Sequence, residues 1–163
     1  MKNKLAKVLM TGIVASSLIF SAQSVFAYGT PAEPDSSSSP NYFSGIGDWF
    51  EGTIVNVEGD DYFIRDTDYF RYVNNTGQTM AFYVKLSTFE NPSLDYVIRS
   101  IGTSGPSYPI ATYSQVHKET GKEVWYVSLP AGHTLDIQVQ SNTFFDFDPD
   151  VKYSIQLSDT PWI

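Results

Sequence analysis

The chain has 163 residues and no cysteine, and its 18 acidic against 10 basic residues give a formal net charge of −8. The absence of cysteine excludes disulfides, thiol catalysis and thiolate metal sites. Because phosphate binding needs clustered lysine and arginine side chains, the charge argues against nucleic acids and against anionic membrane or wall-polymer surfaces as partners.

The first 27 residues have the pattern of a secretory signal peptide. A basic start with Lys2, Lys4 and Lys7 precedes an apolar run over residues 8–20, and Ala27 ends a small-x-small type of cleavage site. The run is short for a membrane span and no second one follows, so we expect no membrane insertion; the alternative is an uncleaved anchor helix. We predict cleavage after Ala27 and a secreted, extracellular protein with a net charge of about −11, since the leader carries three lysines and no acid.

Residues 28–50 begin as a polar stretch that contains three prolines and a run of four serines. A segment of this composition cannot bury enough apolar surface to order itself. It therefore predicts an N-terminal linker. The end of the stretch, with Phe43, Trp49 and Phe50, is more apolar and is a candidate to dock on the domain that follows.

From residue 51 onward, short runs of alternating apolar and polar residues succeed one another. Residues 79–86 are typical, because Phe82, Val84 and Leu86 alternate with smaller or polar neighbours. This period of two indicates half-buried antiparallel strands, and turn residues such as Asn, Gly and Pro separate the runs. The predicted strands are residues 53–57, 69–73, 79–86, 94–101, 110–116, 124–129, 133–140 and 151–157.

The mature chain has no stretch with a helical pattern. About eight short strands in a chain of this length predict an all-β fold. We expect residues 51–163 to form an antiparallel β-sandwich or jelly roll of about eight strands.

Four segments of the chain form a characteristic series. An acidic turn leads into an aromatic strand and a Gly-containing turn over residues 66–79. A leucine–aspartate strand follows at 92–98, a leucine-proline-alanine-glycine turn at 127–135 and a closing strand at 152–157. In this order the segments resemble the bacterial pre-peptidase C-terminal domain family, which is related to the collagen-binding domains of collagenases. The resemblance implies a β-sandwich and a non-catalytic binding or accessory role.

Two acidic groups in loops are candidates for calcium, which prefers several carboxylate and carbonyl oxygens. In the collagen-binding relatives, calcium binds where the segment before the first aromatic strand meets an acidic loop, and the resemblance implies the same region here. The alternative is that these acids solvate turns and protect strand edges. The first group is Glu58, Asp60, Asp61, Asp66 and Asp68, and the second is Asp146, Asp148 and Asp150.

Aromatic residues make up 15% of the chain, which is high for a small domain. Aromatic rings that point outward from a sandwich face build a flat surface on which sugar or proline rings stack. Alternation leaves the direction of Tyr69, Tyr83 and Tyr126 open between this role and core packing, so they are candidates for ligand contact.

The sequence shows no catalytic constellation. It contains no G-x-S-x-G and no H-E-x-x-H motif, and no nucleophile is paired with a base at a recognisable spacing. We therefore expect a protein without enzymatic activity that binds an extracellular protein or polysaccharide, with calcium as its only candidate cofactor. The alternative is a structural or interaction protein of the cell envelope or extracellular matrix.

Overall fold

The computed structural model describes residues 28–162 except 34, 60–61, 89–90 and 92. These residues form strands and no helix, so none of them lies in a helix that could cross a membrane. The strands are β1 (Tyr28–Gly29), β2 (Asn41–Phe43), β3 (Trp49–Gly52), β4 (Val57–Glu58), β5 (Phe63–Ile64), β6 (Asp68–Val73), β7 (Met80–Ser87), β8 (Tyr96–Ser104), β9 (Thr112–Glu119), β10 (Lys122–Leu129), β11 (Thr134–Ser141) and β12 (Tyr153–Ser158).

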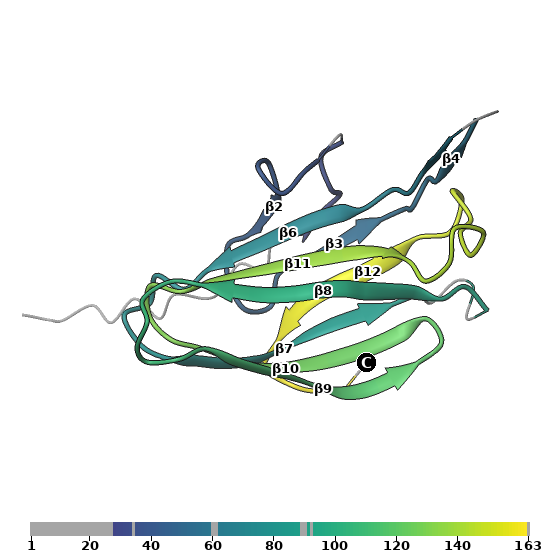
Figure 1. Ribbon diagram of the computed structural model, residues 1–163. Coiled ribbons are helices and arrows are strands. Elements are labelled where there is room, and N and C mark those ends of the chain that lie inside the picture. Colours follow the sequence, from purple (N-terminus) through teal and green to yellow (C-terminus); the bar gives the residue numbers. More distant parts are fainter. Residues whose placement is uncertain (1–27, 34, 60–61, 89–90, 92, 163) are drawn as a thin grey trace, which may run out of the picture.

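The strands form two packed sheets and a separate hairpin (Figure 1). One sheet has six strands in the order β1-β3-β12-β7-β10-β9, and the other has four in the order β2-β6-β11-β8. The β4–β5 hairpin projects beyond the sandwich at one end (Figure 1). All pairs are antiparallel except β1–β3 and β2–β6, so the predicted antiparallel-rich β-sandwich is confirmed, with twelve strands in the described residues rather than eight.

The core lies between the two sheets and follows the alternation of the sequence. In β7, Phe82, Val84 and Leu86 are fully buried, while Tyr83 and Lys85 between them are partly exposed. Burial of one face of each strand removes apolar surface from water and sets the register of the sheet. Strands β6 to β12 each overlap a predicted strand.

Residues 28–50 do not form the linker that their composition predicts. The stretch contributes β1, β2 and the start of β3, and Phe43 lies in the core at 4% exposure. The serines form a tight turn, in which Ser36 and Ser39 exchange backbone hydrogen bonds of 3.4 and 3.0 Å. The prediction fails because β1 and β2 are ordered by parallel pairing with distant strands, which composition does not reveal.

The strand predicted over residues 53–57 is also wrong, because β3 ends at Gly52 and residues 53–56 are irregular. Side-chain hydrogen bonds replace a strand ladder there. Asn56 is buried and donates to the Ser141 hydroxyl at 2.9 Å and to the Phe144 carbonyl at 2.7 Å. Its side-chain oxygen accepts from the Asp66 N–H at 2.9 Å, so this segment fixes the approach to β6.

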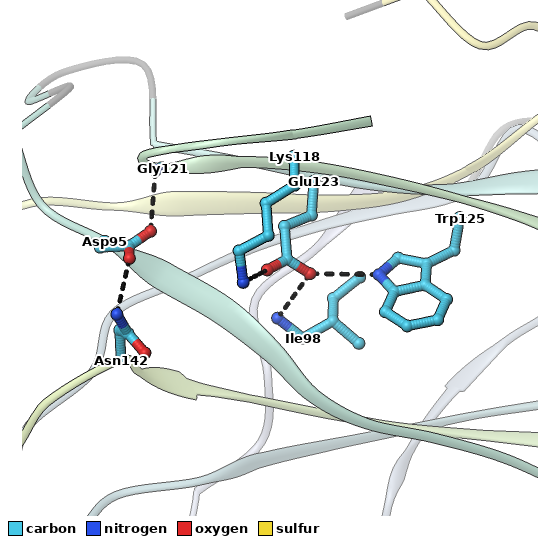
Figure 2. Close-up of polar contacts among 7 residues, drawn as sticks. All are labelled: Asp95, Ile98, Lys118, Gly121, Glu123, Trp125 and Asn142. Carbon is cyan, nitrogen blue, oxygen red and sulfur yellow. Dashed lines mark hydrogen bonds and ion pairs between the residues drawn. The ribbon is translucent and has the colours of Figure 1, made fainter. Parts of the chain in front are cut away.

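A buried carboxylate joins the two sheets on the side where β8 forms an edge (Figure 2). Glu123 of β10 is 1% exposed, and its Oε2 accepts from the Ile98 backbone N–H at 3.3 Å and from the Trp125 indole N–H at 3.1 Å. Its Oε1 lies 3.0 Å from the Lys118 ammonium. The carboxylate thus accepts a hydrogen bond from a backbone N–H, that of Ile98, which lies on the edge strand β8.

A second acidic side chain ties together the turns beside this edge. Asp95 accepts hydrogen bonds from the Gly121 N–H at 3.1 Å and from the Asn142 side-chain amide at 2.8 Å (Figure 2). Gly121 has a φ of 68°, a left-handed conformation that glycine adopts without strain. Asp95 therefore stabilises the β9–β10 turn and the end of β11 together.

Candidate functional site

The N-terminal segment lies against the start of β6 and is held there by an aspartate. Asp35 accepts hydrogen bonds from the Tyr69 N–H at 2.7 Å and from the Asn41 side-chain amide at 2.9 Å. Because Asn41 is the first residue of β2, the two bonds fix the register of the parallel β2–β6 pair. Glu33, two residues before Asp35, lies near the start of β6.

Three carboxylates converge where this segment meets β6. One carboxylate oxygen from each of Glu33, Asp66 and Asp68 lies within 4.8 Å of the other two. Asp66 is held by two hydrogen bonds, since its N–H donates to Asn56 and its Oδ2 accepts from the Val55 N–H at 2.8 Å. The side chains that form this acidic cluster therefore come from two segments far apart in the sequence.

Asp68 is the buried member of the acidic cluster. It is 0% exposed, and its Oδ2 accepts a short hydrogen bond from the Tyr153 hydroxyl. Its Oδ1 is also buried and has no hydrogen-bond partner among the described residues. An unsatisfied buried polar atom is costly and rare in native proteins, so Oδ1 needs a partner that the described residues do not supply.

Burial raises the pKa of Asp68 to about 8, against the opposing effect of the Tyr153 hydrogen bond. The other charges that act on it, those of Asp66, Glu33 and Asp35, are all negative and raise the pKa further. Burial likewise raises the pKa of Asp35 to about 6, with Glu33 and Asp66 adding to the effect. Among the described residues, the charges that act on the pKa values of Asp68 and Asp35 are thus all negative.

The acidic cluster fits a divalent cation that prefers oxygen. Calcium binds carboxylate oxygens at about 2.3–2.6 Å, so two of its ligand atoms are at most about 5 Å apart. The three carboxylate oxygens of the acidic cluster, all within 4.8 Å of one another, meet this condition. The set contains no nitrogen or sulfur donor, which disfavours zinc. Glu33, Asp66 and Asp68 would hold the ion, and the unpartnered Oδ1 of Asp68 would gain a ligand bond.

The first predicted acidic group is brought together only in part. Asp66 and Asp68 belong to the cluster, whereas Glu58 is exposed on β4 and is not a member of it. Asp60 and Asp61 lie outside the described residues. Glu33 was missed because it falls in the stretch interpreted as a linker; the available signal was the pair of acids, Glu33 and Asp35, within a proline-rich segment.

The second predicted group, Asp146, Asp148 and Asp150, does not form a cluster of metal-ligating atoms in the structure. Its carboxylates cap backbone groups instead. Asp146 accepts from the Asp95 N–H at 3.2 Å, and Asp148 accepts from the Asp150 N–H at 2.9 Å. These contacts support the alternative that the acids stabilise turns.

Two of the three candidate tyrosines lie side by side. Tyr83 of β7 and Tyr126 of β10 occupy paired positions, and their rings meet edge to face at 5.5 Å. Both alternate with buried residues and face outward from the six-stranded sheet. Tyr69 lies on β6 and faces outward from the other sheet, so the three do not form one site.

Further aromatic rings share the outer face of the six-stranded sheet. Trp49 of β3 contacts Tyr28 of β1 at 4.6 Å, and Trp162 follows β12 with 78% of its surface exposed. The sequence did not group Tyr28 and Trp49 with Tyr83, because both belong to the stretch interpreted as a linker. We call the rings of Tyr28, Trp49, Tyr83, Tyr126 and Trp162 the aromatic face.

In comparisons with known proteins, no family model matches the chain, and a search of curated proteins finds no match. The resemblance to the pre-peptidase C-terminal family therefore stays a prediction.

Proposed function

We propose that the protein is a secreted, non-catalytic binding module that holds an extracellular polymer, either protein or glycan. The observation that carries this proposal is the aromatic face, which gathers five rings on the outer side of one sheet. Tyr28 and Trp162 are exposed and the other three residues are partly exposed, and outward rings on a sheet suit the binding of flat, repeating ligands.

We further propose that a calcium ion bound by the acidic cluster stabilises the module. The ion would link Glu33 of the N-terminal segment to Asp66 and Asp68 at the start of β6. The buried, unpartnered Oδ1 of Asp68 supports this role. Calcium would thereby hold β1 and β2 on the sandwich in a protein that has no disulfide to do so.

The contacts of the two histidines support the proposal that the module is non-catalytic. His133 is buried, and its Nδ1 lies 3.3 Å from the Ala131 carbonyl. His117 lies 3.5 Å from Glu119 on an exposed strand. These contacts place neither histidine against a serine or threonine hydroxyl that it could activate.

The second candidate function is that of a structural or interaction protein. The observation that favours it is an apolar surface at the end of the sandwich where the β4–β5 hairpin projects (Figure 1). Phe63 and Ile64 of this hairpin are 62% and 56% exposed, and Phe145 in the neighbouring loop is 74% exposed. Phe144 joins hairpin and loop by ring contacts, so this apolar end is a continuous patch suited to a protein partner.

Co-sedimentation with insoluble polymers tests the proposed function. The mature protein in calcium is mixed with fibrillar collagen, chitin, cellulose and peptidoglycan, beside a Tyr83→Ala/Tyr126→Ala double variant and a Phe145→Ala control. We expect at least one polymer to retain the wild type and the control but to release the double variant. Retention by none of the four would overturn the polymer-binding proposal and favour the alternative.

A further inference from the structure

The aromatic face has a regular arrangement that follows from the strand register. Trp49 pairs with Gln156 of β12, which pairs with Lys85 of β7. The next row of outward positions runs from Ser158 through Tyr83 and Tyr126. Since β12 lies between β3 and β7, Trp49 and Tyr83 are two strand spacings apart across the sheet, about 10 Å, and one row apart along the strands, about 7 Å.

Two hollows lie on this face, and each combines one or two rings with hydrogen-bonding side chains. The first has a volume of about 510 Å³ and is lined by Trp49, Gln156, Ser158 and Asp159, among others. Ala81 and Tyr83 are successive outward positions of β7, and Ala81 lines this hollow while Tyr83 lines the next. The first hollow lies over β3, β12 and β7 and the second over β7, β10 and β9, so the two follow one another diagonally across the sheet.

The second hollow has a volume of about 560 Å³ and is partly built by the C-terminal segment. The Lys85 ammonium donates to the Trp162 carbonyl at 2.7 Å, which holds this segment on the sheet. Trp162 nevertheless stays 78% exposed and lines the hollow together with Tyr83 and His117. An indole held in place but left unpacked is available to a ligand.

The chemistry of the lining selects among polymers. Both carboxylates and basic groups line the hollows, with Asp159 in the first and Glu119, His117 and Lys122 in the second. This mixture favours a ligand without charge, and the strongly acidic chain disfavours polyanions. The hollows lie on a sheet face and combine apolar side chains, such as Met80 and Val116, with hydrogen-bonding ones, which suits sugar rings with an apolar face and a hydroxyl rim.

We propose that the aromatic face binds an uncharged glycan chain that lies across the strands, with sugar rings on Trp49, Tyr83 and Trp162. A pyranose has an apolar C–H face for stacking and hydroxyl groups around its rim for Gln156, Ser158 and Lys122. This inference rests on the proposed function and selects the glycan from the two polymer classes.

Titration with soluble, uncharged oligosaccharides tests the glycan. Cellohexaose and chitohexaose are added to the mature protein in calcium, and binding is followed by tryptophan fluorescence and calorimetry. Trp125 points to the inner side of the sheet, so a change in emission reports on Trp49 and Trp162. We expect Trp49→Ala, Tyr83→Ala and Trp162→Ala each to weaken binding about tenfold, or about 1.4 kcal/mol.

Matched controls separate stacking from general aromatic exposure. Tyr69→Ala on the outer face of the other sheet and Tyr108→Ala, at a loop position 85% exposed, should bind as the wild type does. Trp162→Ala lies in the terminal segment, so it should leave the melting temperature unchanged even if Trp49→Ala lowers it. Loss of binding in the two controls, or full affinity in the three face variants, would overturn the inference.

A collagen-model triple-helical peptide is titrated in parallel. If that peptide binds through the aromatic face and neither oligosaccharide does, the glycan inference is overturned while the proposed function stands. If neither class of ligand binds and no insoluble polymer retains the protein, both are overturned.

Discussion

Two buried carboxylates, Glu123 and Asp68, lie in the same sandwich but have opposite surroundings. Glu123 has a partner for each oxygen, namely the Lys118 ammonium on one and two N–H donors on the other. Asp68 has the Tyr153 hydroxyl on one oxygen, none on the other among the described residues, and further carboxylates around it.

The difference shows where the chain supplies the counter-charge for a buried acid and where it does not. At Glu123 a lysine from the neighbouring strand completes the site, so the ion pair is part of the fold. At Asp68 the nearest charges are of the same sign, so the carboxyl is either protonated or neutralised by a cation from solvent. The proposed calcium ion would fill the position that Lys118 fills at Glu123.

The largest expected effect is the loss of calcium stabilisation in Asp68→Asn. At a calcium concentration one hundred times the dissociation constant, the wild type should gain about 2.7 kcal/mol in free energy of unfolding over the protein in EDTA. The variant should lose most of this gain, because a neutral amide oxygen binds calcium much more weakly than a carboxylate and removes one negative charge from the site. Thermal unfolding in EDTA and in calcium measures both. Asp148→Asn, from the second acidic group, should keep the full gain, and a loss there would contradict the assignment of the ion to the acidic cluster.

Lys118→Met should destabilise the protein by about 2 kcal/mol, because it leaves Glu123 buried without a counter-charge. This value is reduced from that of a fully buried pair, since the lysine side chain is 53% exposed. Urea unfolding measures the loss. The loss of stability should be equal with and without calcium, since the two carboxylates are separate sites. Lys122→Met, at the outward position next to Glu123, is the control. A loss that calcium restores would break the distinction between the two carboxylates.

The stability of the metal-free protein in EDTA should depend on pH through Asp68. The folded-state pKa of Asp68 is about 8, well above the ordinary value near 4, so folding favours its protonated form. Its contribution to stability is therefore complete below about pH 4 and is lost as the pH rises towards 8, by at most about 1.4 kcal/mol per pH unit. The difference in unfolding free energy between wild type and Asp68→Asn across this range isolates the effect. A difference that does not change with pH would show that Asp68 is ionised in the metal-free fold.

Glu33→Gln should have a smaller effect than Asp68→Asn, because Glu33 is exposed and is one of three ligands. We expect the calcium concentration for half-maximal stabilisation to rise about tenfold while the fold in EDTA is unchanged. The calcium dependence of the melting temperature measures it, with Glu58→Gln as the control on β4. An identical response in Glu33→Gln and wild type would remove the N-terminal segment from the site.

The sequence predicts those parts of the molecule that depend on local alternation. Strands β6, β7, β11 and β12 bury every second residue over most of their length, and Asp66 and Asp68 stand out because they precede and begin such a strand. The sequence does not predict β1 and β2, which form strands only by parallel pairing with β3 and β6. Glu33 was missed for the same reason, since the pairing of β2 with β6 brings it to the start of β6, where Asp68 lies.

The same limit applies to the aromatic face. Tyr83 and Tyr126 could be proposed from alternation within their own strands. Trp49 and Trp162 join them only through the strand order and the C-terminal hydrogen bond to Lys85. A pattern of period two gives the side of a strand on which a residue lies, but not the neighbours that share that side.

Calorimetric titration of calcium chloride into chelator-treated protein tests the central claim most directly. For the wild type we predict one binding site per chain, and for Asp68→Asn we predict no binding heat over the same range. A wild type that releases or absorbs no heat at millimolar calcium, or an Asp68→Asn variant with an unchanged site, would contradict the account of Asp68 as a carboxylate completed by a cation.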